Sequence, residues 1–129
     1  MSRLLLDTHA LLWAVAAPER LSAPVRQHLL DPSTELLVSA ASAWEIATKH
    51  RMGKLPDAAV LLDGWDDALV QLRADPLPIT HADARRAGRY DVTHRDPFDR
   101  LLAAQAEHSG ARLVTADAAF AAFPVTVLW

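Results

Sequence analysis

The chain has 129 residues, which is near the commonest size of a single domain and enough to bury a core without disulfides. Its hydrophobic share of 51% and charged share of 22% are those of a globular protein and exclude a disordered chain. The formal net charge of −3 excludes nucleic-acid binding that is driven by bulk charge alone. We therefore expect one domain that spans residues 1–129.

Three further observations narrow the class of protein. The longest apolar run covers only residues 10–17, whereas a membrane-spanning helix needs about 20 residues. The leucine-rich start imitates a secretory signal, but Asp7 and His9 interrupt it with polar groups. The sequence contains no cysteine, which excludes disulfides, thiolate metal sites and cysteine nucleophiles. These features lead us to expect a cytoplasmic protein.

In the first half of the chain, short apolar runs alternate with segments of helical periodicity. Pro18 ends the first helix, Ser22 caps the second, and Gly53 closes the third. The segment after Gly53 is helical in character but is interrupted by Gly64. The predicted elements are a strand at residues 3–7, helices at 8–16 and 21–30, a strand at 35–39, and helices at 40–52 and 55–73.

Prolines and a capping pattern punctuate the second half of the chain. Pro76 and Pro78 leave room for a short strand at most, and Thr80-x-x-Asp83 matches a capping box. The predicted elements are a strand at residues 77–79, helices at 80–88 and 96–109, a strand at 112–115, a short helix at 118–123 and a strand at 125–128. Because strands alternate with helices, we expect an α/β fold in which helices cover both faces of a mainly parallel sheet.

Four carboxylates stand where apolar runs stop, namely those of Asp7, Glu45, Asp99 and Asp117. Asp7 and Asp117 follow predicted strands, and the other two lie in helices that are expected to start at the same edge of the sheet. Ligands of parallel sheets bind at this carboxyl edge. Gathered carboxylates repel one another and take up protons unless a cation compensates, and a hard cation such as Mg²⁺ takes oxygen ligands. The sequence therefore predicts a metal site at this edge.

Each acid also has a structural alternative. Asp7 and Asp117 are placed to cap the helices that follow them, and Asp96-Pro97-x-Asp99 is a favourable helix opening in its own right. Ser42-x-x-Glu45 matches a capping box, but Ser39 is the better cap and places Glu45 nearly two turns inside the helix. These alternatives do not predict that all four acids share one edge, so we favour the metal site.

Polar and basic side chains flank the acids. We expect Thr8, Ser39 and Thr115 to donate hydrogen bonds to carboxylate oxygens or to metal-bound water. Two stretches are rich in basic residues, which either contact phosphate or form a solvated charged surface. The candidates for contact with a phosphate backbone are Lys49, Arg51, Lys54, Arg95 and Arg100. The 6 histidines are scattered along the chain, so we do not expect a histidine base.

Five segments, taken in order, carry a resemblance to a known family. They are residues 4–9 (LLLDTH), 39–46 (SAASAWEI, followed by Lys49), 53–55 (GKL), 94–102 (HRDPFDRLL) and 113–117 (LVTAD). In this order and at this spacing they resemble a PIN domain, and more narrowly the toxin ribonucleases of bacterial VapBC toxin–antitoxin pairs. The resemblance covers nearly the whole chain.

The resemblance implies a three-layer α/β/α sandwich and an endoribonuclease in which water activated by Mg²⁺ or Mn²⁺ hydrolyses RNA phosphodiesters. It also implies a homodimer that is inhibited by a cognate VapB-type antitoxin, whose tail occupies the active-site groove. The acidic metal-binding set of the family falls on Asp7, Glu45, Asp99 and Asp117. Asp96 lies in the same matched segment as Asp99, residues 94–102, and is a further candidate ligand.

Two other functions stay open at this point. An acidic pocket on a parallel sheet is compatible with a phosphoacceptor or phosphatase-like domain that carries the phosphoryl group on Asp7, although Glu45 would then have no obvious role. A non-catalytic module that binds a partner through Trp13, Trp44 and Trp65 is the second alternative, because aromatic residues of this kind occur in interfaces as well as in cores.

Overall fold

A parallel five-stranded sheet forms the centre of the protein in the computed structural model, which describes residues 2–129. The strands lie in the order β3-β2-β1-β4-β5, and every neighbouring pair is parallel. Their bounds are β1 Arg3–Leu6, β2 Glu35–Ser39, β3 Ala74–Leu77, β4 Arg112–Val114 and β5 Val127–Leu128. The parallel sheet that the alternating pattern predicted is confirmed.

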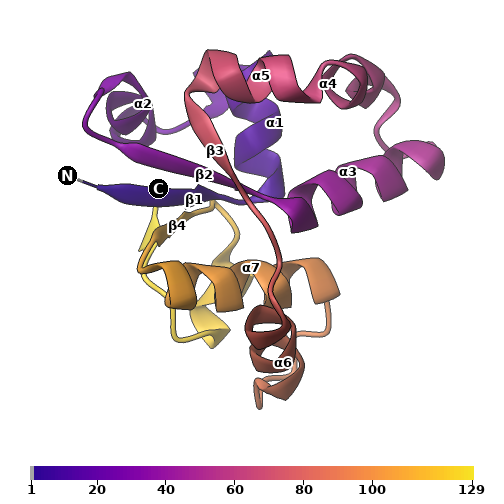
Figure 1. The fold of residues 1–129 in the computed structure, drawn as a ribbon, viewed down its shortest axis with the longest axis vertical. Helices are drawn as coiled ribbons and strands as arrows, with labels where there is room; N and C mark the ends of the chain where they lie inside the picture. The colour runs from indigo at the N-terminus through magenta and orange to yellow at the C-terminus, as the bar shows by residue number, and fades with distance from the viewer. Residues whose placement is uncertain (1) are drawn as a thin grey trace.

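Helices cover both faces of the sheet (Figure 1). On one side lie α1, α2, α4 and α5, and on the other lie α6 and α7, while α3 extends outward from the end of β2. The α-helices are α1 Thr8–Ala16, α2 Ala23–Leu30, α3 Ala40–Arg51, α4 Ala59–Asp63, α5 Trp65–Leu72, α6 His81–Arg89 and α7 Pro97–Ser109. Three short 3₁₀ helices are η1 Pro18–Arg20, η2 Pro56–Ala58 and η3 Ala118–Ala122.

The sheet separates two hydrophobic cores. Leu4 and Leu6 of β1 belong to the core beneath α1 and α2, whereas Leu5 belongs to the core beneath α7. Successive side chains of a strand point to opposite faces, so a strand covered on both faces must be apolar at every position. This requirement explains why the strands read as uninterrupted apolar runs. The three-layer α/β/α sandwich is confirmed.

The third strand differs from its prediction. It covers Ala74–Leu77 rather than residues 77–79, and it pairs with β2 from Leu36 to Ser39. The strand contains Pro76, which has no amide hydrogen, and it lies at the edge of the sheet, where one side of the backbone needs no partner. Similarly, the helical segment predicted at residues 55–73 is divided into η2, α4 and α5.

The connections after three strands bring the acidic residues to one edge. Asp7 follows β1 directly, α3 begins at the residue after β2, and Thr115 follows β4. The Asp7 amide donates to the Val114 carbonyl at 3.0 Å, which ties the ends of β1 and β4 together. Because the strands are parallel, all of these turns emerge at their shared carboxyl edge. No helix within residues 2–129 is long and apolar enough to cross a membrane.

Candidate active site

Asp7 serves as a helix cap and lies in the acidic site at the same time. Its carboxylate accepts a hydrogen bond of 2.8 Å from the Ala10 amide at the start of α1. The residue is buried, and this burial raises the pKa of the Asp7 carboxyl above its usual value, against the opposing hydrogen bonds from Thr115 and Ala10. The nearby charge of Glu45 raises it further. The capping alternative and the site therefore do not exclude each other.

Glu45 lies inside α3, with only 4% of its surface exposed. Ser39 caps this helix by accepting from the Ala41 amide at 2.9 Å, so the capping box at Ser42 is not formed. The Thr8 hydroxyl donates to one Glu45 oxygen at 2.6 Å, and the Lys49 ammonium pairs with the other. A carboxylate that is buried and held from two sides is preorganised for a ligand.

Asp96 and Asp99 stand at the start of α7. Asp96 caps the helix by accepting from the Phe98 and Asp99 amides at 2.9 and 3.1 Å. Asp99 contacts His94 Nε2 at 2.8 Å. Burial raises the pKa of the Asp99 carboxyl to about 6, with His94 acting to lower it and the charges of Asp96 and Glu45 acting to raise it.

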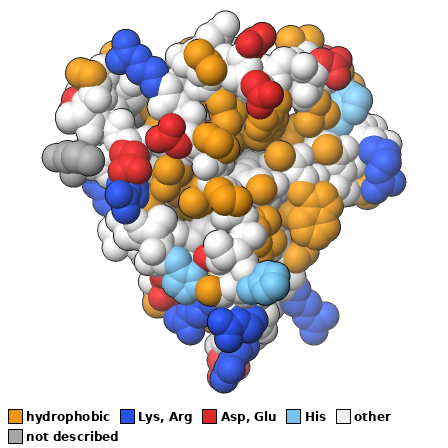
Figure 2. Space-filling view, in the orientation of Figure 1, with side chains coloured by type: hydrophobic (Ala, Val, Ile, Leu, Met, Phe, Trp, Pro, Cys, Tyr) orange, Lys and Arg blue, Asp and Glu red, His pale blue; other side chains and the backbone are white. Residues whose placement is uncertain are grey.

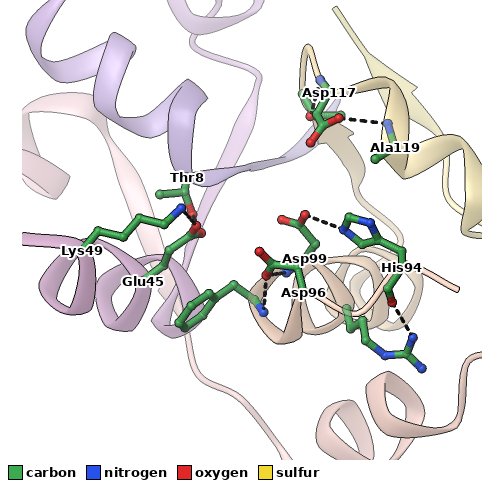
Figure 3. Close-up of polar contacts among 11 residues, drawn as sticks. Thr8, Glu45, Lys49, His94, Asp96, Asp99, Asp117 and Ala119 are labelled. Carbon is green, nitrogen blue, oxygen red and sulfur yellow. Dashed lines mark hydrogen bonds and ion pairs between the residues drawn. The ribbon is translucent and has the colours of Figure 1, made fainter. Parts of the chain in front are cut away.

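Glu45, Asp96 and Asp99 share one electrostatic environment with the Lys49 ammonium (Figure 3). Partial burial acts to lower the pKa of Lys49, but the hydrogen bond and charge of Glu45, together with the charges of Asp96 and Asp99, raise it overall. Glu45 is likewise close enough to Asp7 and Asp99 to raise the pKa of each. The site therefore holds acids contributed by the start of α1, by α3 and by α7.

Asp117 lies apart from this group. It is exposed, and its carboxylate accepts from the Ala119 amide at 2.9 Å as the cap of η3 (Figure 3). Within residues 2–129, no group of three His, Asp or Glu side chains is arranged closely enough to hold one metal ion. The donors nevertheless suit a hard cation, because burial raises the pKa of Asp7 and Asp99 and an added positive charge would relieve that cost.

Of the three predicted hydrogen-bond donors, two contact an acid in the structure. Thr8 contacts Glu45, and a hydrogen bond from Thr115 lowers the pKa of Asp7. Thr115 also accepts from the Asp117 amide at 3.0 Å, within the turn that follows β4. Ser39, in contrast, donates to Gln105 of α7 instead of to an acid. Its position at the end of β2 turns its hydroxyl toward the neighbouring helix.

Arg100 is engaged with the backbone of its own chain, and its contact with an RNA backbone stays a prediction that this geometry does not favour. Its three guanidinium nitrogens donate to the backbone carbonyls of Ala87, Gly88, Tyr90, Val92 and His94, at 2.6 to 3.4 Å. All five N–H groups of an arginine can be used in this way, which leaves none for a phosphate. Arg100 therefore holds the segment that leads from α6 to His94. Of the other basic candidates, Lys49 lies in the site, and Arg51, Lys54 and Arg95 are exposed.

Two contacts in the site were not predicted. The pairing of Glu45 with Lys49 could have been predicted from the sequence, because a Glu four residues before a Lys forms a favourable pair on a helix. The contact between His94 and Asp99 had only the motif around Asp96 as a signal. His94 precedes the helix, so no periodicity relates its side chain to that of Asp99, and the Arg100 contacts that hold this segment become visible only in the folded chain.

A parallel α/β/α sandwich that collects carboxylates at the ends of its strands is consistent with one protein family in particular. The PIN domain model matches residues 4–125, and the chain belongs to the PIN domain family. The chain is 33% identical to ribonuclease VapC22 of Mycobacterium tuberculosis over 118 residues, which are 91% of this chain and 88% of that protein. It is 40% identical to ribonuclease VapC16 of the same organism over 52 residues, 40% of this chain and 37% of that protein.

A solved structure supports the fold independently. The protein is similar to a chain in the crystal structure of VapBC2 from Rickettsia felis bound to a DNA fragment from their promoter, with a TM-score of 0.67 and 16% identity. The match covers 98% of this chain and 97% of the other. At this identity the likeness concerns the fold.

Proposed function

We propose that this chain is a metal-dependent endoribonuclease that acts as the toxin of a type II toxin–antitoxin pair. The observation that carries the proposal is the gathering of Asp7, Glu45 and Asp99 from three separate elements at the carboxyl edge of the sheet. The ribonuclease names of the two VapC relatives give the reaction, and hydrolysis of RNA phosphodiesters is the chemistry that such an acidic site supports.

Asp7, Glu45 and Asp99 are the residues that would hold Mg²⁺ or Mn²⁺, with Asp96 and Asp117 as further ligands. Such an ion supplies Lewis acidity toward the phosphate and lowers the pKa of bound water. The remaining residues have positioning roles. Thr8 fixes the orientation of Glu45, His94 fixes that of Asp99, and the Lys49 ammonium offsets the negative charge that would otherwise repel a phosphate.

The partners and location follow from the same assignment. We propose an RNA substrate, a cognate VapB-type antitoxin, a homodimer and a cytoplasmic protein. The likeness to a chain of VapBC2, solved on a fragment of promoter DNA, supports the antitoxin as partner. The lack of cysteine agrees with a reducing compartment. Arg51, Lys54 and Arg95 are exposed and stay candidates for contact with the RNA backbone.

The two alternatives gain no support from the site. A phosphoacceptor needs an accessible carboxylate, whereas Asp7 is buried and one of its oxygens caps α1. The partner-binding module was to use three tryptophans, but Trp13 and Trp65 pack against the first core and only Trp44 is strongly exposed.

Cleavage of a structured RNA tests the proposal directly. The parent chain and Asp7→Asn are purified free of any partner and incubated with RNA in EDTA, in Mg²⁺ and in Mn²⁺. We expect cleavage by the parent only with metal and a loss of at least about 100-fold in the variant, the scale on which a removed transition-state stabiliser acts. Asp31→Asn is the matched control, since Asp31 is exposed and caps a turn before β2. Cleavage in EDTA, or equal cleavage by Asp7→Asn, would contradict the proposal.

A further inference from the structure

Two aromatic side chains border the acidic site without belonging to it. Trp44 of α3 directly precedes Glu45, and Phe98 of α7 directly precedes Asp99. Their rings meet edge to face, with centroids 4.6 Å apart and an interplanar angle of 76°. The pair therefore bridges the two helices that supply Glu45 and Asp99, and it lies one residue away from each acid along the chain.

Trp44 is exposed to solvent, although it lies next to a buried acid on the same helix. Trp44 is 54% exposed, and Phe98 is not among the partly buried side chains that pack against either hydrophobic core. Neighbouring positions on a helix point about 100° apart, so Glu45 can be buried while Trp44 is exposed. A tryptophan that is half exposed beside a polar site presents ring surface that a ligand can cover.

The surroundings of the pair suit a nucleic acid better than a second protein. Ala40, Ala47 and Arg51 share the exposed face of α3 with Trp44, so the face has one large ring, two small side chains and one cation. A stable protein interface needs about 800 Å² on each partner, whereas a single base needs only a ring on which to stack. In the face of the molecule drawn in Figure 2, hydrophobic side chains gather over α3, and Lys or Arg side chains lie toward its far end.

We propose that Trp44, supported edge-on by Phe98, stacks an unpaired base of the RNA strand next to the phosphate that is cleaved. This inference rests on the proposed ribonuclease function and adds a residue-level role, in which Trp44 and Phe98 hold an unstacked base of the substrate beside the acids. A duplex offers no free base face, because its bases are already stacked. The stacking interaction itself accepts any base, since every base has a π-face.

RNA binding in EDTA tests this stacking platform apart from cleavage. The anisotropy of a labelled single-stranded RNA is measured with the parent, Trp44→Ala and Trp44→Phe, and a duplex of the same sequence is measured in parallel. We expect Trp44→Ala to bind the single strand about 10-fold more weakly, Trp44→Phe to stay within about 3-fold of the parent, and the duplex to bind weakly to all three. Leu30→Ala is the control, because Leu30 is also an exposed apolar residue, with 83% of its surface accessible. It ends α2, before the start of β2, whereas the acids lie at the other end of the strands.

A second measurement locates the base and controls for folding. Single abasic nucleotides are moved along the RNA, and at one position the loss of the base should weaken binding by the parent about 10-fold but leave binding by Trp44→Ala unchanged. Equal RNA affinities of the parent and Trp44→Ala would overturn the stacking platform. It would also be overturned if Trp44→Ala changed only the equilibrium between monomer and dimer, measured by sedimentation, and left the RNA affinity unchanged. The proposed function is judged separately, by metal-dependent cleavage by the parent, so that the two can fail independently.

Discussion

At the scale of single residues, the site contains carboxylates that are held in place at an electrostatic cost. Asp7 and Asp99 both have a pKa raised by burial, and Glu45 adds repulsion to each of them. Hydrogen bonds from the Ala10 amide and contact with His94 offset only part of this cost. A buried acid with a raised pKa binds a proton more tightly in the folded chain than in the unfolded chain, so folding and ionisation oppose each other.

The pKa of Asp99 gives a prediction about pH. Because it is raised from 3.8 to about 6, the folded state binds more protons than the unfolded state between these values, and the free energy of unfolding should fall as pH rises from about 4 to about 6. Urea denaturation in EDTA measures this slope. In Asp99→Asn the free energy of unfolding should fall less steeply with pH than in the parent, because the titrating carboxyl is gone. Saturating Mg²⁺ should also make the slope of the parent less steep. A parent slope that the substitution leaves unchanged would show that Asp99 is not its source.

At the scale of elements, helix starts and one arginine place the site. Ser39 and Asp96 cap α3 and α7, and these caps fix where each helix begins and hence where Glu45 and Asp99 face. Arg100 then holds the segment between α6 and α7 through its backbone carbonyls. The position of His94 therefore depends on a residue of the helix that His94 precedes.

Arg100→Lys should act through this segment instead of through RNA. A lysine cannot reproduce the planar set of donors, so we expect a loss of about 1–3 kcal/mol in the free energy of unfolding and a lower cleavage rate. The dependence of RNA affinity on salt should keep the parent's slope, because no phosphate contact is lost. Arg95→Gln is the matched comparison and should flatten that slope with little loss of stability. A flatter salt dependence for Arg100→Lys would instead support the predicted contact of Arg100 with the RNA backbone.

At the scale of the whole molecule, a ligand bound between β1, α3 and α7 would couple distant parts of the chain. An ion that binds only the folded protein stabilises it by about 2.7 kcal/mol at a concentration 100 times its Kd. Asp7, Glu45 and Asp99 belong to elements that meet only in the folded chain, so the unfolded chain offers no such site. Thermal stability should therefore rise with metal concentration.

The acids should differ in this metal-induced stabilisation. Calorimetry of the parent, Glu45→Gln and Asp117→Asn over a range of Mg²⁺ concentrations measures it. We expect Glu45→Gln to lose most of the rise in Tm, because Glu45 is buried at the centre of the acidic group. Asp117→Asn should keep most of it, because Asp117 is exposed and engaged with the Ala119 amide. Equal losses would show that metal binding draws Asp117 into the group.

The local pattern of the sequence determined the layers and the edge at which the acids gather. Strands covered on both faces must be apolar throughout, and parallel strands end at a common edge, so runs such as residues 4–6 and 36–38 were sufficient to predict the architecture. Prolines misled the placement of β3, because the tolerance of an edge strand for Pro76 depends on the order of strands in the sheet.

Only the tertiary structure decided which partner each side chain takes. Arg100 carries the same local signal whether it binds a phosphate or five backbone carbonyls, and Asp117 has the same neighbours in sequence whether or not it reaches the other acids. Hydrogen-bond partners are chosen by competition among groups that folding brings together from distant positions, whereas apolar periodicity acts over a few residues. The sequence by itself therefore determined the fold and the chemistry of the edge, and the folded chain decided the geometry of the site.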